Sequence, residues 1–268
     1  MAAMTRTVAL GDIGPVELFL DDTGEGEPPY LLLHGGGGPD TMTRFGQRFA
    51  ESHPVRVLVP THPGFTGTTR PERLDTIGGL AALYVAMLDD LDLNDVRVVG
   101  NSIGGWITVE MALIKSPRIS GIVLIDAVGI DVADQPVADF FTTGYDEFLE
   151  RAFNDPGPFR IDPTSLSPAA QAAAAANRSA LATYTGGAMN DPTLAERLGG
   201  LDIPTLILWG DSDRIAAPEY GRAYANSIPM ARFQVLTDVG HLPQVETPDA
   251  VIETVWNNRD IASPRARQ

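Results

Sequence analysis

Gly100-Asn101-Ser102-Ile103-Gly104-Gly105 is the stretch from which the fold can be inferred. It follows an apolar run at 96–100 that is typical of a buried strand, and it leads into a helical pattern at 103–114. A serine with glycine two residues before and two residues after it fits a turn too sharp for a Cβ at either position. The pattern predicts that the Ser102 hydroxyl projects from the end of a sheet, with the N–H of Ile103 directed at a developing oxyanion. The alternative is a glycine-rich strand–helix turn with an exposed serine.

Short apolar strands alternate with helical patterns on both sides of this turn. Strands are expected at residues 6–10, 16–21, 30–33, 55–59, 96–100, 119–125, 204–209 and 233–236. Helices are expected at residues 41–52, 76–91, 103–114, 218–227 and 248–257. Alternation of this kind predicts an α/β protein with a mostly parallel eight-stranded sheet that is flanked by helices.

One long stretch, residues 127–201, lacks the buried-strand pattern. It is rich first in aromatic residues, then in proline, and at 169–184 in alanine, which favours helix. We expect a helical cap at residues 128–200, inserted over the carboxyl ends of the strands, where sheets of this class bind ligands. Residues 1–127 and 201–268 would then form the core domain. The alternative is an ordinary pair of crossover helices, although a plain crossover would be much shorter.

A nucleophilic serine needs a base to accept its proton, and the chain offers four histidines. His241 lies in the loop between the last expected strand and the last expected helix, a position that would place it over Ser102. His62 follows another strand and is the competing candidate. His53 ends a helix and is expected to face solvent, whereas His34 belongs to a glycine-rich loop. The order of the elements therefore predicts His241 as the base.

Three aspartates follow expected strands at the same edge of the sheet. Asp211 and Asp213 come after the seventh strand, and Asp126 comes after the sixth. A carboxylate beside the base orients the imidazole and stabilises its charged form. We predict Asp213 as this acid, because the order Ser102, Asp213, His241 is the nucleophile–acid–base order of sheet hydrolases. Asp126 is the alternative acid, and Asp211 could cap a turn.

The run Leu33-His34-Gly35-Gly36-Gly37-Gly38-Pro39 follows the strand expected beside the serine strand. Its four glycines allow backbone N–H groups to approach a ligand without obstruction by side chains. We expect the N–H of Gly36 or Gly37 to form an oxyanion hole with that of Ile103. His34 is expected to make a structural contact that fixes the loop. A phosphate-binding loop is disfavoured, because the run lacks the Gly-Lys-Ser/Thr ending.

Four motifs together resemble those of the α/β-hydrolase superfamily. They are the His-Gly-rich loop, Gly-x-Ser-x-Gly-Gly, Trp-Gly-x-x-Asp ending at Asp213, and Gly-His-x-Pro at His241. The resemblance extends from about Tyr30 to the closing helix and keeps the family's motif order. It implies the α/β-hydrolase fold with a helical cap after the sixth strand. It also implies Ser102 as nucleophile, His241 as base and Asp213 as acid, since the family places its acid at the last position of Gly-x-x-Asp.

The resemblance also narrows the activity. Epoxide hydrolases and haloalkane dehalogenases of this fold use an aspartate nucleophile, which Ser102 argues against. The serine motif is similar to those of esterases and of hydrolases that cleave carbon–carbon bonds of ring-fission products. The latter usually carry tryptophan after the base histidine, where this chain has Leu242. The family often has aspartate before Pro-Gly after its fourth strand, whereas Thr61 stands here before His62-Pro63-Gly64.

These features imply a cofactor-independent serine hydrolase that acts on carboxylic esters through an acyl-enzyme. The alternatives are a carbon–carbon bond hydrolase of the ring-fission-product type and a non-catalytic ligand-binding protein on the same fold. Aromatic residues of the expected cap either line an apolar pocket or pack the cap onto the core, among them Phe140, Phe141, Tyr145 and Phe148. A carboxylate-binding arginine in the pocket would favour carbon–carbon cleavage, and the cap offers Arg151, Arg160 and Arg178.

Composition excludes several other functions. The 268 residues include 19 Lys and Arg against 35 Asp and Glu, and a net charge of −16 would repel nucleic acids. No apolar run approaches the ~18 residues of a membrane helix, and residues 1–6 contain no apolar stretch, so we expect no signal peptide and a cytoplasmic protein without membrane contact. The chain has no cysteine and no short metal-ligand spacing, so we expect no metal and no cofactor, only a small-molecule substrate. Residues 263–268 are expected to form a frayed tail.

Overall fold

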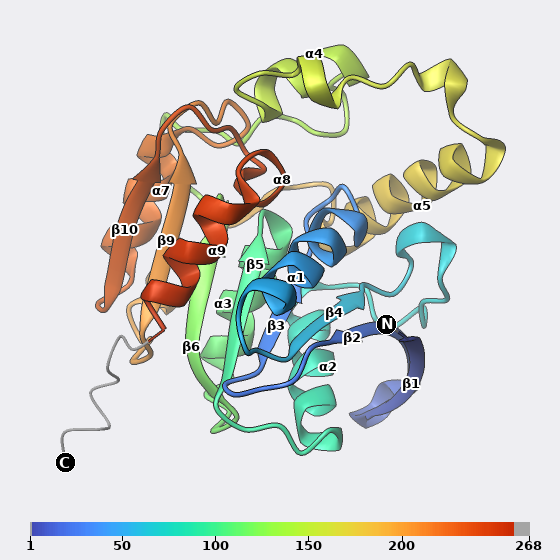
Figure 1. Cartoon of the computed structure of the whole chain (residues 1–268), viewed down its shortest axis with the longest axis vertical. Helices are drawn as coiled ribbons and strands as arrows, with labels where there is room; N and C mark the ends of the chain where they lie inside the picture. The colour runs from blue at the N-terminus through green and yellow to red at the C-terminus, as the bar shows by residue number, and fades with distance from the viewer. Residues whose placement is uncertain (1, 260–268) are drawn as a thin grey trace.

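The sheet that carries the site has eight strands in the computed structural model, which describes residues 2–259 (Figure 1). They are β1 (Ala2–Leu10), β2 (Gly14–Thr23), β3 (Tyr30–Leu33), β4 (Val57–Thr61), β5 (Val96–Asn101), β6 (Ile119–Ile125), β9 (Thr205–Gly210) and β10 (Ala231–Leu236). Their order is β1-β2-β4-β3-β5-β6-β9-β10. The pairs β1–β2 and β2–β4 are antiparallel, and the other pairs are parallel. The predicted mostly parallel eight-stranded sheet is confirmed, and the tail expected at 263–268 lies outside the described residues.

Helices cover both faces of this sheet. They are α1 (Asp40–Ser52), α2 (Ile77–Asp90), α3 (Ile103–Leu113), α7 (Pro218–Ser227), α8 (Pro243–Glu246) and α9 (Pro248–Asn257), with the short turns η1 (Gly11–Ile13) and η2 (Phe65–Gly67). In β3, Leu31 and Leu33 join a core cluster with residues of α2 and α3, whereas Tyr30 and Leu32 join one with residues of α1 and α9. Because successive strand side chains point to opposite faces, this apolar run is buried on both sides.

The helix α2 follows directly from its sequence. The side chain of Thr76 accepts a hydrogen bond from the N–H of Gly79 at 3.0 Å and so caps the first turn. Leu80, Tyr84 and Leu88 recur every four residues and are completely buried. The helix expected at 76–91 is thus present, and it brings the Tyr84 hydroxyl beneath the site.

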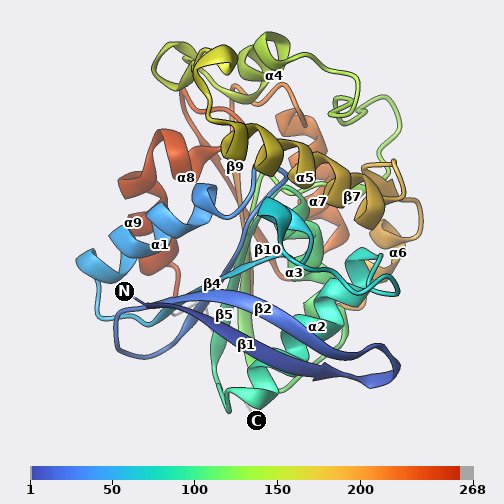
Figure 2. The same cartoon turned by 90° about the vertical axis from the view of Figure 1, so that its right-hand side faces the viewer.

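The chain between β6 and β9, which we call the insertion, is mostly helical. It contains α4 (Tyr145–Ala152), α5 (Pro168–Thr185) and α6 (Leu194–Leu198), with the turns η3 (Gly157–Phe159) and η4 (Pro163–Ser165). Figures 1 and 2 show α4 at one end of the molecule, and Figure 2 shows α5 between α4 and the sheet. The side chain of Ser167 caps α5 by accepting from Ala170 N–H, and Gly186 ends it in the left-handed region at φ 62°. The division into a core and a cap at residues 128 and 200 remains a prediction.

A second small sheet was not expected from the sequence. Two-residue strands, β7 (Gly129–Ile130) and β8 (Asn190–Asp191), pair in parallel and join the start of the insertion to its end. Sequence reasoning placed no strand in this stretch. Two residues are too few to show an alternating pattern, so only the tertiary structure reveals the pair.

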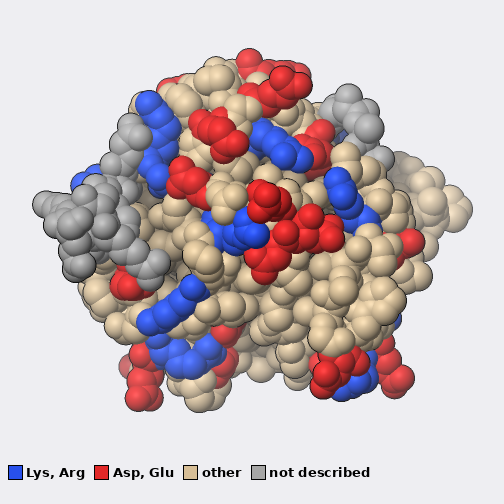
Figure 3. Space-filling model, turned by 90° about the horizontal axis from the view of Figure 1, so that it is seen from below, with Lys and Arg blue, Asp and Glu red and all other residues tan. Residues whose placement is uncertain are grey.

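Charged side chains of both signs share the face opposite α4, which Figure 3 shows with acidic groups next to basic ones. The guanidinium of Arg118 pairs with Asp89 at 2.9 Å and with Asp92 at 2.8 Å. Such exposed pairs contribute little to stability, about 0–1 kcal/mol each. Within residues 2–259, no helix combines the length and the apolar character needed to cross a membrane.

Candidate active site

Ser102 occupies the turn between β5 and α3, and its backbone is strained. It lies at φ 56° and ψ −119°, a region that residues with a Cβ rarely adopt. Its N–H donates to Ile125 O at 3.0 Å, which ties the turn to the neighbouring strand. A Cβ at Gly100 would stand 2.1 Å from Gly104 O, and one at Gly104 would stand 2.1 Å from Leu33 O. The expectation that neither glycine position has room for a side chain is confirmed.

His241 and Asp213 form a hydrogen-bonded pair at the same end of the sheet. The Nδ1 atom of His241 lies 2.8 Å from Asp213 Oδ2, and both residues are buried. The other carboxylate oxygen of Asp213 accepts the N–H groups of Ile215 at 2.7 Å and Ala216 at 3.1 Å. With its proton on Nδ1, the His241 ring presents Nε2 as a free acceptor. The His241 N–H donates to Ala152 O at 2.7 Å, which anchors its loop.

Ser102 and His241 line one cavity of about 240 Å³. Among the described residues, the Ser102 hydroxyl has no hydrogen-bond partner, so the expected close contact between Ser102 Oγ and His241 remains a prediction. Catalytic hydrogen bonds often tighten only when a substrate is bound.

Asn101 is a site residue that sequence reasoning missed. Its buried side-chain amide donates to Ile125 O at 3.1 Å and to His241 O at 3.0 Å. The amide therefore connects the serine turn to the loop that carries His241. The only sequence signal was its place between Gly100 and Ser102 in the motif, and that place does not show which distant carbonyl the side chain reaches.

The glycine-rich loop borders the same cavity. Gly36, Gly37 and Ile103 line it together with Ser102, as an oxyanion hole requires. The side chain of Asn177, on α5, donates to Gly37 O at 3.2 Å and so links the insertion to this loop. The expected position of the loop beside the serine agrees with the structure, while the role of its N–H groups remains a prediction.

A buried histidine pair supports the glycine-rich loop from below. The Nε2 atom of His34 accepts the N–H of His62 at 3.1 Å, so its Nδ1–H donates to Gly35 O at 2.8 Å. The Nε2–H of His62 donates to His34 O at 2.9 Å, and its Nδ1 accepts from Tyr84 Oη at 2.5 Å. These bonds require both rings to be neutral. Burial lowers the pKa of His34 to about 4, and burial with the nearby His34 lowers the pKa of His62 well below its usual value.

The remaining histidine, His53, and the other two candidate aspartates take no part in the His241–Asp213 hydrogen bond. The expectation that His53 faces solvent was wrong, since its ring stacks on Trp256 at 4.5 Å between centroids and is mostly covered. Asp211 accepts from the Ser212 hydroxyl at 3.0 Å in a turn, as its alternative role required. Asp126 is completely buried and accepts from Gly210 N–H at 2.9 Å, but it does not bond to His241.

The cavity over Ser102 is mostly apolar, because apolar side chains of the insertion make up much of its lining. Among the expected cap aromatics, Phe140, Tyr145 and Phe148 line it, and Phe141 does not. Phe153, Phe159 and Leu181 add further apolar surface. A pocket of this kind binds the apolar part of a substrate through burial of its surface.

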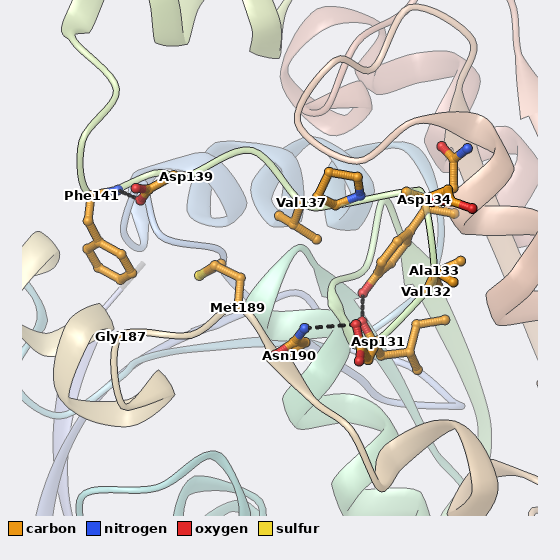
Figure 4. A pocket seen from close by; sticks show the side chains of 14 residues that line it. Asp131, Val132, Ala133, Asp134, Val137, Asp139, Phe141, Gly187, Met189 and Asn190 are labelled. Atoms are coloured by element: carbon orange, nitrogen blue, oxygen red, sulfur yellow. Dashed lines mark hydrogen bonds between the residues drawn. The ribbon is translucent and has the colours of Figure 1, made fainter.

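A second, more open cleft adjoins this cavity. It has a volume of about 620 Å³ and shares Val137 and Met189 with the cavity over Ser102. Figure 4 shows its lining, with the Asn190 amide directed at Asp131, to which it donates at 3.2 Å. Phe141 belongs to this cleft, as do the carboxylates of Asp131, Asp134 and Asp139.

Among the described residues, one group has ligand atoms close enough together to consider a metal ion. It consists of Asp126, Asp213 and His241, whose ligand atoms lie within 4.8 Å of one another. The Nδ1 atom of His241 already pairs with Asp213, and Asp213 also accepts two backbone N–H groups. Hydrogen bonds thus satisfy most of this donor set, and we assign no metal to it.

Comparison with known proteins identifies the family. The family model described as "Alpha/beta hydrolase family" matches residues 30–254. The chain belongs to the alpha/beta hydrolase family. As in other members, its fold is a mostly parallel eight-stranded sheet flanked by helices. It is therefore a hydrolase.

Individual relatives of this hydrolase differ in their named activities. It is 29% identical to Lipase 3 of Moraxella sp. (strain TA144), over 84% of this chain and 74% of that protein. It is 27% identical to a 2-hydroxy-6-oxononadienedioate/2-hydroxy-6-oxononatrienedioate hydrolase of Cupriavidus pinatubonensis (strain JMP 134 / LMG 1197), over 91% of each chain. A solved thermophilic esterase from Thermogutta terrifontis superposes with a TM-score of 0.75 at 27% identity, over 95% of this chain and 97% of that one.

Proposed function

We propose that this hydrolase cleaves carboxylic esters through an acyl-enzyme on Ser102. The observation that carries the proposal is the His241–Asp213 hydrogen bond of 2.8 Å at the edge of the cavity that Ser102 also lines. Asp213 is held in place by two backbone N–H groups, so its carboxylate can orient the imidazole and stabilise its charged form. A buried pair of this kind beside a strained serine is the arrangement that activates a hydroxyl.

In the proposed reaction, Ser102 Oγ attacks the ester carbonyl while His241 Nε2 takes its proton. The negative charge that develops on the carbonyl oxygen is stabilised by the N–H of Ile103 and that of Gly36 or Gly37. His241 then gives its proton to the leaving alcohol as the carbon–oxygen bond breaks. Water attacks the acyl-enzyme with His241 again as base, which releases the acid and restores the Ser102 hydroxyl.

The second candidate is carbon–carbon bond cleavage, which relatives with ring-fission substrates in their names favour. Those names describe carboxylates, and burying a carboxylate costs free energy unless a cation or hydrogen-bond donors compensate. No lysine or arginine among the described residues lines the cavity over Ser102.

The three cap arginines have other partners. Arg151 pairs with Glu147 at 2.8 Å, and Arg160 pairs with Asp146 and with Glu150, the latter at 2.8 Å. Arg178 donates to the carbonyl of Phe141 at 2.8 Å and lies over the Phe140 ring. An ester with an apolar acyl group therefore fits this cavity better than a ring-fission carboxylate does.

The decisive experiment measures kcat/KM on p-nitrophenyl acetate, butyrate and octanoate and on 2-hydroxy-6-oxo-6-phenylhexa-2,4-dienoate. Ester turnover that disappears in Ser102→Ala, with little cleavage of the ring-fission product, is the expected result. Faster cleavage of the ring-fission product would make the second candidate correct. A folded protein that turns over neither class would instead support the non-catalytic alternative. A fluorophosphonate adduct located on Ser102 by mass spectrometry would identify the nucleophile independently.

A further inference from the structure

Asp126 is a fully buried carboxyl group to which the proposed mechanism gives no task. It follows β6 with φ 44°, in the left-handed region, and its N–H donates to Leu208 O at 3.0 Å. Its Oδ1 accepts from Gly210 N–H at 2.9 Å, whereas no described residue offers a donor to its Oδ2. A buried acceptor without a donor is costly, so this atom needs an explanation.

The neighbours of Asp126 are mainly acceptors. Ligand atoms of Asp126, Asp213 and His241 lie within 4.8 Å of one another. Two carboxylates buried this close cannot both be ionised, because each charge repels the other and neither is solvated by water. Glu246 is half-buried nearby, and its negative charge also acts on Asp126. Its carboxylate accepts hydrogen bonds from the N–H groups of Gly240 and Asn154.

The hydrogen bonds decide which carboxyl carries the proton. Asp213 receives three donors, from His241 Nδ1 and from the N–H groups of Ile215 and Ala216, and all three favour its ionised form. Asp126 receives one donor. Burial and the charge of Asp213 raise the pKa of Asp126 well above its usual value.

We propose that Asp126 is a neutral carboxylic acid whose Oδ2–H donates a hydrogen bond to the Asp213 carboxylate, and that it is a positioning residue for the His241–Asp213 pair. This role rests on the proposed function of that pair as acid and base. The donated bond explains the lone buried Oδ2 atom, since an oxygen without a donor becomes a donor when it is protonated. It also draws negative charge away from Asp213, so the His241 imidazolium is stabilised less than it would be beside a fully charged carboxylate.

Two substitutions separate this role from a packing role. Asp126→Asn keeps a neutral N–H donor for Asp213 and an acceptor for Gly210, whereas Asp126→Ala removes both. We expect Asp126→Asn to leave the acidic limb of the kcat/KM–pH profile on p-nitrophenyl butyrate in place. Asp126→Ala should move that limb upward by about one pH unit, because Asp213 then carries its full charge. Asp211→Asn, in an exposed turn, is the matched control and should leave the limb unmoved.

Equal shifts in both Asp126 variants, or an unmoved limb in Asp126→Ala, would overturn the proposal. If a variant fails to fold, infrared spectroscopy of the wild-type protein still tests it. A hydrogen-bonded, protonated carboxylic acid band should be present at neutral pH and should survive in Glu246→Gln. Absence of that band, or its loss in Glu246→Gln, would contradict the assignment. The band does not depend on turnover, so a protein that shows it but hydrolyses no ester would refute the proposed function alone.

Discussion

The end of the sheet that holds Ser102 and the insertion that covers it are built differently. Backbone hydrogen bonds and close approaches between glycines hold the serine turn, and most residues of α3 are buried. In the insertion, only Leu149 and Ala152 of α4 are buried, and the buried residues of α5 begin at Asn177. Segments with few buried contacts open more easily than a core strand. Under the proposed function, we expect the sheet to set the reaction and the insertion to select the substrate.

The largest expected effect on activity comes from a substitution at the end of the sheet that holds Ser102. Ser102→Ala should lower kcat/KM by about 10⁵-fold on every ester, because the step that depends on its hydroxyl is lost. Kinetics on p-nitrophenyl acetate and octanoate, with circular dichroism to verify folding, provide the measurement. A folded variant that keeps activity on one ester would show that another residue supplies the nucleophile.

The next effect concerns the acid. Asp213→Asn should lower kcat by about 10⁴-fold with little dependence on the acyl chain, because the amide favours the wrong tautomer of His241. Asp211→Asn is the control and should stay within about twofold of wild type, as exposed substitutions away from a site usually have small effects. If the two variants behave alike, Asp213 is not the acid.

A third prediction tests whether His34, in the buried histidine pair that supports the glycine-rich loop, is neutral. On unfolding between pH 6.5 and about 4, His34 takes up a proton, so its contribution to stability is lost as the pH falls through this range. His34→Gln keeps an acceptor for His62 and should reduce the pH slope of the unfolding free energy by about 1.4 kcal/mol per pH unit. Urea denaturation of both proteins at several pH values measures the slope, and identical slopes would contradict a neutral, buried His34.

The smallest effect, and the one selective among substrates, is expected in the insertion. Phe148→Ala should lower kcat/KM on p-nitrophenyl octanoate by about tenfold, since Phe148 lines the cavity and contacts with the acyl chain are lost. The acetate ester fills little of the cavity and should be nearly unaffected. Phe141→Ala is the matched control, because Phe141 lines the neighbouring cleft. Equal losses on both esters would mean that Phe148 does not shape the pocket selectively.

Local patterns predicted the elements that their own residues determine. Gly100 is demanded by a contact within its own turn, with the carbonyl of Gly104, and the apolar run of β3 is demanded by burial on both faces of its own strand. The order of His241 and Asp213 along the chain also placed both at the same edge of the sheet. For these features, a residue and its near neighbours contain the physical reason.

Other features depended on which distant residues meet. That His241 forms its hydrogen bond with Asp213 and not with Asp126 depends on where two separate strands end, and both aspartates follow strands in the sequence. The small β7–β8 sheet and the cleft that Phe141 lines could not be read from local spacing either.

The sequence by itself determined the α/β architecture and the serine turn, because hydrophobic periodicity and the lack of room for a Cβ at Gly100 act over a few residues. Only the tertiary structure decided that Asn101 reaches the carbonyl of His241 and that Tyr84 supports His62. It also placed Asp126 close to Asp213 and gave the arginines of the expected cap partners outside the lining of the cavity over Ser102. The physical reason is that a hydrogen bond or a carboxyl pair needs two groups within a few ångströms, and chain folding alone brings residues so far apart in sequence to that distance.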